Sequence, residues 1–231
     1  MITVLYYTAN VVNEIFAKNV RRQLRDAAGG LPIVSVSQKP IDFGENICVG
    51  NIGRSHINIY RQVLIAAECA RTPYVALCED DILYTPEHFA DYLPVEDSFS
   101  YNLNRWRIYT WSKYFSYTGR IVLSQMIAPR KLLIAALQER FAKYPDESTI
   151  PDLSYFCEPG RRERLLGVSL QKKVNYESSG PPNIVFTHPD SIGFDYMGEK
   201  KSHGPRKERR LTHWGTVEDV MQNFYINERK I

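Results

Sequence analysis

An apolar segment that ends in three acidic residues constrains the fold of this chain more than any other part of its sequence. Residues 74–78 form a run of low polarity after Pro73, and Glu79, Asp80 and Asp81 follow directly. The shortness of the run and the flanking proline predict a buried strand. Adjacent carboxylates repel one another and destabilise a fold unless a cation or hydrogen-bond donors compensate. Two interpretations remain open, a site for Mg²⁺ or Mn²⁺ and a solvated acidic loop.

The first part of the chain changes its hydrophobic period twice. Residues 2–8 are rich in β-branched and aromatic side chains, residues 12–26 repeat apolar side chains at helical spacing, and residues 31–37 read as a strand again. This order implies a right-handed βαβ unit with parallel strands, which binds ligands at the carboxyl ends of those strands. The polar residues expected there are Thr8, Asn10 and Asp42.

Composition indicates an ordinary globular protein. The chain has 231 residues, of which 44% are hydrophobic and 24% charged, and this suits one domain with a substantial core. The net charge of +3 identifies no partner by itself. Basic residues nevertheless gather near the C-terminus, in the order Lys200, Lys201, Arg206, Lys207, Arg209 and Arg210.

Cysteine spacing and hydropathy indicate the cellular compartment to expect. The four cysteines lack the C-x-x-C spacing of zinc sites, and nothing in their arrangement indicates a disulfide scaffold. No leader and no apolar run of membrane-spanning length is recognisable. We therefore expect reduced thiols in a soluble, cytoplasmic protein without a membrane span.

A glycine-containing turn precedes the next predicted helix. Residues 50–62 open a helix that is expected to run to about Ala70, and Arg54 can present its planar guanidinium to a phosphate at the helix start. The turn contains neither the P-loop Gly-Lys-Ser/Thr motif nor G-x-G-x-x-G. The nucleoside triphosphatase and Rossmann dehydrogenase interpretations therefore lose their main support.

The combined pattern resembles a known family. A βαβ unit, the motif Asn51-x-Gly53-x-Ser55-x-x-Asn58, a helix and an apolar strand that ends in acids are together similar to nucleotide-sugar glycosyltransferases of the GT-A fold, particularly the family 2-like group. The resemblance implies an α/β, Rossmann-like single domain with a mixed, mainly parallel sheet flanked by helices. It also implies a nucleoside diphosphate sugar as donor, most often a UDP-sugar, and Mn or Mg as cofactor.

The resemblance also assigns residues. In the family the first acid lies near the ribose and the last binds the metal, which corresponds here to Glu79 and Asp81, although Asp is commoner than Glu at the first position. His188 follows a predicted strand at 183–187, where the family places a late metal ligand, and a hydrogen-bonded core histidine is the alternative. The expected donor contacts are Thr8, Asn10, Asp42, Asn51, Arg54, Gln62, Glu79 and Asp80.

A narrower likeness concerns the acceptor. Residues 84–89 resemble a mostly viral set of glycosyltransferases that act on hydroxymethylated pyrimidines in DNA, which implies a DNA acceptor and, for a viral chain, the host cytoplasm. The basic cluster would then contact DNA phosphates. Trp106 or Trp111 would stack on a flipped base, or else pack in a strand at 108–111. A saccharide acceptor is the alternative.

The remaining pattern predicts the acceptor half. A strand at 121–127 and a helix at 129–144 precede Asp152 and Glu158, either of which could be the base that an inverting transfer requires, or a helix cap or surface pair. We expect a catalytic domain over 1–192, divided into a donor half at 1–90 and an acceptor half at 91–192. Residues 193–231 would form a mobile basic loop and a closing helix from residue 216.

Other classes of protein remain possible from sequence. A nucleotidyltransferase would use similar carboxylates and release pyrophosphate. A nuclease would need a two-metal cluster and would cut DNA without a nucleotide sugar. A non-catalytic nucleic-acid-binding protein would use the basic cluster and the aromatic residues without needing the acids.

Overall fold

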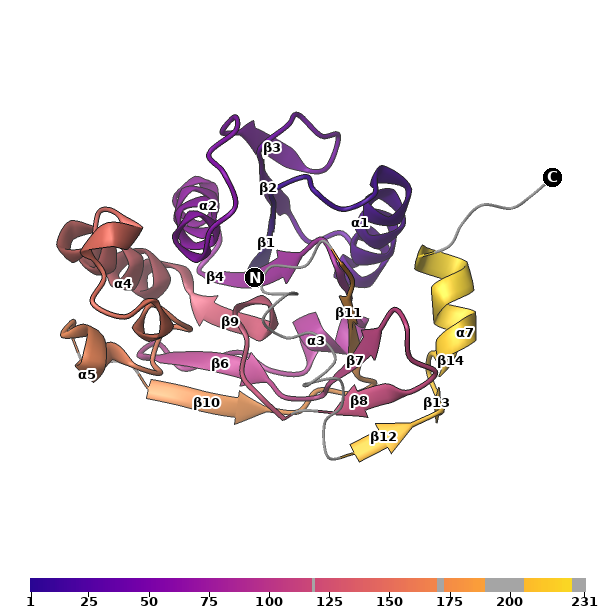
Figure 1. The fold of residues 1–231 in the computed structure, drawn as a ribbon. Coiled ribbons are helices and arrows are strands. Elements are labelled where there is room, and N and C mark those ends of the chain that lie inside the picture. Colours follow the sequence, from indigo (N-terminus) through magenta and orange to yellow (C-terminus); the bar gives the residue numbers. More distant parts are fainter. Residues whose placement is uncertain (118, 170–172, 190–205, 226–231) are drawn as a thin grey trace.

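A seven-stranded sheet runs through the centre of the molecule (Figure 1). The computed structural model describes residues 1–117, 119–169, 173–189 and 206–225. Every neighbouring pair of strands in the sheet is parallel except the two pairs that contain β9. The fold class is therefore confirmed, a mixed and mainly parallel sheet within one α/β domain. In spatial order the strands are β10 (Lys173–Glu177), β6 (Ser98–Asn102), β9 (Met126–Pro129), β4 (Tyr74–Glu79), β1 (Ile2–Thr8), β2 (Ile33–Ser37) and β3 (Glu45–Cys48).

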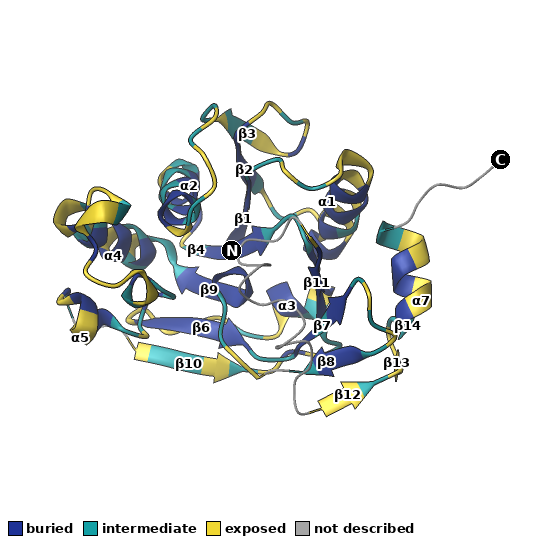
Figure 2. Ribbon diagram, in the orientation of Figure 1, coloured by how far each residue is buried: buried dark blue, intermediate teal, exposed yellow. Residues whose placement is uncertain are grey.

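Helices cover both faces of this sheet. Alternate residues of β1 point to opposite faces, so Leu5 packs with α2 (His56–Cys69) and α4 (Arg130–Lys143), whereas Val4 packs with the C-terminal half of α1 (Glu14–Ala28). Figure 2 shows the strands of the sheet centre as buried and the outer surfaces of the three helices as exposed. The short helix α3 (Pro86–Ala90) adds Phe89 to the face that α1 covers.

A second, five-stranded sheet lies beside the first and was not expected from sequence. Its core contains Phe16 and Val20 of α1, so that α1 packs against both sheets. It also contains residues of the C-terminal segment, namely α7 (Val217–Val220) and the π-helical turn Met221–Tyr225. Its order is β12 (Arg206–Glu208), β8 (Phe115–Tyr117), β7 (Arg105–Tyr109), β11 (Asn183–Thr187) and β5 (Ile82–Leu83).

The acidic triplet joins the two sheets. Glu79 is the last residue of β4 in the first sheet, and Ile82 begins β5 in the second. The backbone N–H of Phe186 in β11 donates to the carbonyl of Asp81 at 2.9 Å, which anchors this turn to the second sheet. The triplet therefore lies at the junction of the two sheets.

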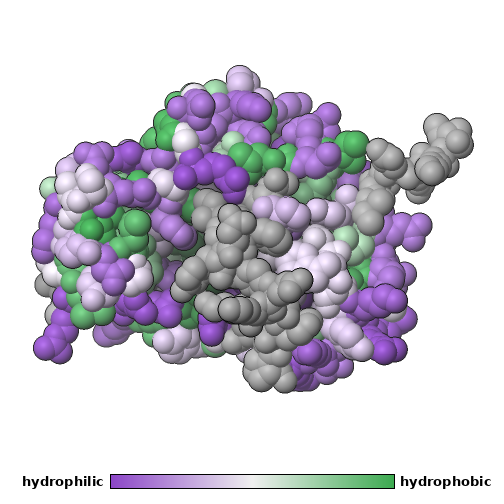
Figure 3. Space-filling model, viewed as in Figure 1, coloured by the Kyte–Doolittle hydropathy of each residue, from purple (hydrophilic) through white to green (hydrophobic). Residues whose placement is uncertain are grey.

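The remaining elements are short. They are the two-stranded ladder of β13 (Arg210–Leu211) and β14 (Gly215–Thr216), the helix α5 (Glu163–Leu166), and the 3₁₀ turns Leu123–Gln125, Glu147–Thr149 and Leu153–Tyr155. Apolar surface lies over α4 and α5 (Figure 3), where Leu165 is exposed. Within the described residues, every helix is too short or too polar to span a bilayer.

Local chemistry explains where the helices begin. The side chain of Asn13 accepts hydrogen bonds from Ile15 and Phe16, and α1 starts at Glu14. The helix predicted from Gly50 instead starts at His56, because Gly50 and Gly53 have φ values of +71° and +80°, which a helix cannot contain.

Two strand predictions near the second sheet were partly wrong. The strand predicted at 108–111 is β7, which ends at Tyr109 and leaves Trp111 46% exposed. Most of the strand predicted at 121–127 is a loop and a 3₁₀ turn, and β9 begins only at Met126. The hydroxyl of Tyr84 donates to the carbonyl of Ser124 at 2.9 Å, so this backbone group bonds to a side chain rather than to a neighbouring strand.

The C-terminal segment belongs to the same domain as the rest of the chain. Lys200, Lys201 and most of the predicted basic loop lie outside the described residues, but Arg206 and Lys207 are in β12, which pairs antiparallel with β8. The prediction of a loop was therefore wrong at these positions. The closing helix begins after a capping box at Thr216, and residues 226–231 of its predicted range lie outside the described part.

Candidate active site

A cavity of about 350 Å³ opens at the carboxyl ends of β1 and β4. The acidic triplet forms one part of its lining, the first turn of α2 and the loop before it form another, and β7 and β11 of the second sheet complete it. Eight of the residues expected at a site from sequence line this single cavity: Thr8, Arg54, Gln62, Glu79, Asp80, Asp81, Glu158 and His188.

Four residues expected at the site do not line this cavity, namely Asn10, Asp42, Asn51 and Asp152. The Oδ1 of Asn10 accepts hydrogen bonds from the backbone of Gln38 and Lys39 at 2.8 and 2.9 Å, which fixes the loop after β1 against the loop after β2. Asn10 and Asp42 line a separate groove on the outer side of α1. Asn51 is exposed, and its Oδ1 accepts from the backbone of Gly53 at 3.2 Å.

Asp152 also lies outside the cavity lining. Its exposed carboxylate caps the 3₁₀ turn that follows it, because Oδ1 accepts from the backbone N–H of Ser154 at 2.8 Å. This arrangement corresponds to the capping alternative that the sequence left open for Asp152.

The three acids have unequal hydrogen bonding. The hydroxyl of Tyr7 donates to Glu79 at 3.0 Å, and the hydroxyl of Thr8 donates to Asp80. In the part of the chain that the structure describes, Oδ1 of Asp81 is buried without a hydrogen-bond partner. Donors from β1 therefore stabilise the first two carboxylates, whereas Asp81 has an oxygen that still requires a cation or a donor.

Burial shifts the protonation of the triplet. It raises the pKa of Glu79 to about 7, and the charge of Asp80 adds to the increase. Burial, followed by the charges of Glu79 and Asp80, raises the pKa of Asp81 well above its ordinary value. Near neutral pH and without a cation, the triplet therefore does not carry its full negative charge.

The raised pKa of Glu79 predicts a pH dependence of stability in the presence of a chelator. Because the folded state holds this proton up to about pH 7 and the unfolded state releases it near 4.5, the free energy of unfolding should fall as the pH rises between these values. Urea titrations at a series of pH values would measure this slope. Glu79→Gln should flatten it, and Glu96→Gln, at an exposed position, should not.

Two arginines that the sequence analysis missed face the acids. Arg105 and Arg107 are two residues apart on β7, so both point into the cavity, and Arg105 is 4% exposed. Burial lowers the pKa of Arg105 to about 10, with a further contribution from Arg107, so Arg105 remains charged at neutral pH. The alternation Arg-Trp-Arg within a strand was the signal that could have identified them.

Glu158 approaches the cavity from a rigid segment. Its Oε2 accepts from Nη1 of Arg161 at 3.1 Å. On one side of Glu158, the fully buried Arg140 donates to the carbonyl of Cys157 at 2.6 Å, and on the other the hydroxyl of Tyr101 donates to the carbonyl of Pro159 at 2.7 Å. These contacts fix the position of a carboxylate that no periodic pattern placed near the acids.

Gln62 has a structural role at the cavity floor. Its Nε2 donates to the carbonyls of Thr8 and Val36 at 2.9 and 3.1 Å. It therefore holds the ends of β1 and β2 together. Gln38 similarly donates to the carbonyl of Gly53 at 2.8 Å and ties the loop before α2 to β2.

The cavity contains suitable donors for a divalent metal, although they do not form a complete cage. Within the described ranges, no three acidic, histidine or cysteine side chains converge as a preformed metal site. Asp81, with its unpartnered Oδ1, and His188 nevertheless line the same cavity. Mg²⁺ and Mn²⁺ accept such ligands and often take their remaining oxygens from water and a substrate's phosphates. The residues present therefore fit a metal that binds together with a diphosphate.

Comparison with known proteins gives no family assignment. No protein-family model matches the chain, and no curated protein matches it by sequence. Among solved structures, the glycosyltransferase GlyE of Streptococcus pneumoniae is 12% identical, with a TM-score of 0.46 over 84% of this chain and 47% of that chain. The chain thus spans about half the length of that protein.

Two further structures have similar scores. The 2-C-methyl-D-erythritol 4-phosphate cytidylyltransferase of Thermus thermophilus is 14% identical, with a TM-score of 0.46 over 81% of this chain and 93% of that chain. A glycosyltransferase involved in the glycosylation of the major capsid of PBCV-1 is 12% identical, with a TM-score of 0.45 over 77% of this chain and 81% of that chain. At such low identities and TM-scores, these likenesses assign no activity to this chain.

Proposed function

We propose that this chain transfers a sugar from a nucleoside diphosphate sugar to an acceptor hydroxyl, with help from a divalent metal. The observation that carries the proposal is the pairing of opposite charges in one cavity. Half-buried carboxylates at the end of β4 line the same cavity as Arg105 and Arg107 of β7. A diphosphate bound to a divalent cation has the complementary charges, since the cation suits the acids and the phosphate oxygens suit the arginines.

The donor would lie along the first sheet. We propose that Glu79 lies beside the ribose and that Asp80 orients this end of the site through its bond with Thr8. Arg54 lies directly before the N-cap residue of α2, where a guanidinium and a helix N-terminus both attract phosphate. Residues 1–90 would thus supply most donor contacts, while the arginines of β7 complete the diphosphate site from the acceptor half.

Asp81 and His188 are the residues that we propose as metal ligands. A divalent cation held there would stabilise the negative charge that develops on the departing diphosphate. Arg105 and Arg107 act on the same charge, and the burial of Arg105 strengthens its attraction by excluding water.

Glu158 is the proposed general base, in preference to Asp152. It lines the cavity and its backbone is held on both sides, whereas Asp152 is exposed and caps a turn. Glu158 would accept the proton of the acceptor hydroxyl as that oxygen attacks the anomeric carbon. A single displacement of this kind inverts the configuration at that carbon.

For the acceptor we propose a 5-hydroxymethyl pyrimidine in DNA, with a saccharide as the alternative. The support is the basic character of the second sheet's edge, where Arg206 and Lys207 of β12 are exposed. Trp106 does not suit base stacking, because it is buried and the guanidinium of Arg206 lies 5.4 Å from its ring centroid. Trp111, which is 46% exposed, remains a candidate for that contact.

A donor screen tests the proposed activity directly. The protein is incubated with Mn²⁺ and a panel of nucleotide sugars, and we expect slow hydrolysis of one donor to a nucleoside diphosphate and a free sugar. In a parallel reaction the protein is given a nucleoside triphosphate together with a sugar phosphate. Release of pyrophosphate from the triphosphate would indicate a nucleotidyltransferase instead. Cleavage of DNA without any nucleotide sugar would indicate a nuclease, and no turnover of any donor would contradict the proposal.

A further inference from the structure

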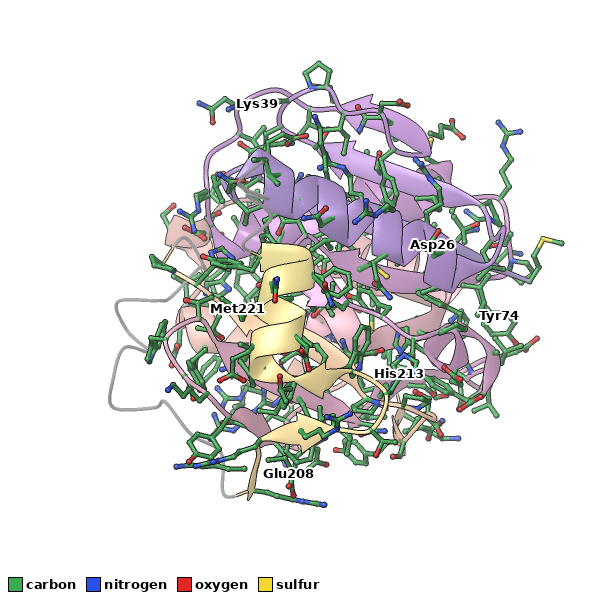
Figure 4. The ribbon with its side chains drawn as sticks, turned by 90° about the vertical axis from the view of Figure 1, so that its right-hand side faces the viewer. Asp26, Lys39, Tyr74, Glu208, His213 and Met221 are labelled. Atoms are coloured by element: carbon green, nitrogen blue, oxygen red, sulfur yellow. The ribbon has the colours of Figure 1, made fainter. Side chains whose placement is uncertain are left out.

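A second groove, of about 540 Å³, lies on the outer side of α1 and has no role in the chemistry described so far. One wall is the exposed surface of α1, and the other is the loop that follows β2. Figure 4 shows α1 across this side of the molecule, with Lys39 of that loop above it. We call it the α1 groove, defined by its basic residues Lys18, Arg21, Arg22, Arg25 and Lys39.

The α1 groove carries an excess of positive charge. Five basic side chains line it, against the carboxylates of Glu14 and Asp42. Glu14 is paired with the largely buried Arg21 at 2.6 Å. Among the residues that the structure describes, the other four basic side chains form no ion pair with a carboxylate, and all four are exposed. Their charges are therefore available to an anion from solution.

The charges form a line rather than a cluster. Lys18, Arg21, Arg22 and Arg25 occupy positions i, i+3, i+4 and i+7 of α1, which places them on one face of the helix. Seven residues of helix rise about 10 Å. This length corresponds to about three successive phosphates of one strand, at about 3.4 Å each along the axis. A single phosphate would instead need donors that converge on one point.

The opposite wall is held in place before any ligand binds. Asn10 accepts from the backbone of Lys39 at 2.9 Å, and the hydroxyl of Ser35 donates to the carbonyl of Phe43 at 2.6 Å. The ring of Phe43 is fully buried and packs edge-on against Tyr6, with 4.9 Å between ring centroids. The guanidinium of Arg25 lies 5.4 Å from the centroid of the same ring, which links the two walls. The groove is therefore preformed.

The α1 groove adjoins the proposed active site. Val12, in the loop between β1 and α1, lines both the groove and the cavity. A chain that follows the groove would thus arrive beside the acids at the end of β4.

We propose that the α1 groove binds the sugar–phosphate backbone of a nucleic acid. Backbone binding follows from the linear basic surface alone. Delivery of an acceptor nucleotide to the cavity rests in addition on the proposed function. The inference places nucleic-acid contacts on α1, on a different surface from the basic residues of β12.

Binding of DNA without donor tests the inference. Fluorescence anisotropy of labelled single-stranded and duplex oligonucleotides is measured over a range of salt concentrations for the wild type and for the triple variant Lys18→Gln/Arg22→Gln/Arg25→Gln. All three positions are exposed, so the fold should persist, and thermal melting checks this. We expect affinity at low salt to fall at least about tenfold, and the slope of log affinity against log salt to decrease by about three.

A matched control removes the same charge elsewhere. Arg71, Lys131 and Arg164 are exposed, and none of them lines the α1 groove. Lys131 is in α4 and Arg164 is in α5, two helices on the other side of the molecule from α1 (Figure 1), and Arg71 follows α2. The variant Arg71→Gln/Lys131→Gln/Arg164→Gln should retain the wild-type affinity and salt slope. An equal loss in both triple variants would overturn the inference, because net charge rather than the groove would then determine binding.

Other outcomes also decide the question. Loss of binding in Arg206→Gln/Lys207→Gln but not in the α1 variant would overturn the inference and assign DNA binding to β12. Displacement of DNA by inorganic pyrophosphate, at concentrations too low to act as simple salt, would also overturn the inference. The same holds if the wild type binds anionic vesicles but not DNA, and the α1 variant loses the vesicle binding. Donor hydrolysis by the α1 variant should equal that of the wild type. If the wild type hydrolyses no donor while the variant loses DNA binding, the groove is supported and the proposed function fails separately.

Discussion

Asp81→Asn should reduce sugar transfer by roughly a thousandfold or more while the protein remains folded and becomes more stable. The activity should fall because asparagine removes the negative charge that we propose for metal binding. The stability should rise because Asp81 is buried beside two other acids and its unpartnered oxygen has no compensating donor among the described residues. Relief of about 1 kcal/mol would raise the melting temperature by about 2–4 °C.

The pH dependence sharpens this prediction. The raised pKa of Asp81 means that the wild type loses stability as the pH rises above the ordinary pKa of aspartate. Above that pH the unfolded state releases the proton, whereas the folded state still binds it. The gain in melting temperature from Asp81→Asn should therefore be larger at pH 7.5 than at about pH 4. Differential scanning calorimetry with a chelator present would measure both values.

A control variant separates the site from general charge effects. Asp26 is an exposed residue of α1, and Asp26→Asn removes the same charge outside the cavity. It should leave turnover and the response to Mn²⁺ unchanged. Full turnover by Asp81→Asn, measured as nucleoside diphosphate released per enzyme, would contradict the proposed metal site.

The second large effect concerns the base. Glu158→Gln should lower kcat by about a hundredfold, because the acceptor hydroxyl loses its proton acceptor. Affinity for the nucleotide sugar should remain, since the amide is isosteric and the donor contacts lie on other elements. Single-turnover kinetics with a saturating donor, together with calorimetric titration of the donor, would distinguish these two quantities.

Asp152→Asn is the matched control for Glu158→Gln. Asparagine caps a helical turn as well as aspartate does, so the turn that follows residue 152 should persist and turnover should change little. The opposite result, with activity lost in Asp152→Asn and retained in Glu158→Gln, would reverse the assignment of the base. Retention of configuration in the product, observed by NMR of the anomeric proton, would exclude inversion.

Local patterns predicted much of the first sheet. β1, α1, β2 and β4 appear where the hydrophobic period placed them, because each depends on burying one face of a short segment between recognisable caps or turns. The exit of β4 into Glu79, Asp80 and Asp81 was readable for the same reason. Helix α2 was misplaced at its start, where glycines with positive φ took the chain out of helical geometry.

The second sheet could not be predicted in this way. β12 pairs with β8 and β11 pairs with β7, and these partners are far apart in the chain. Strand pairing depends on packing against neighbours that come together only in the folded protein. The sequence of a short strand therefore does not indicate which strand it pairs with. The arginines of β7 and the acids of β4 are therefore brought together by an arrangement that no local spacing indicates.

Periodicity and turn chemistry act over a few residues, and they were enough to predict the parallel βαβ beginning and the acidic strand exit. Which charged groups share the cavity depends instead on contacts between distant segments. These contacts placed Glu158 at the cavity and left Asp152 as a cap, and they set Arg105 and Arg107 opposite the triplet. The α1 groove also depends on contacts between distant segments, because the backbone N–H of Lys39 donates to the side chain of Asn10, 29 positions away, and this bond holds the loop beside the helix.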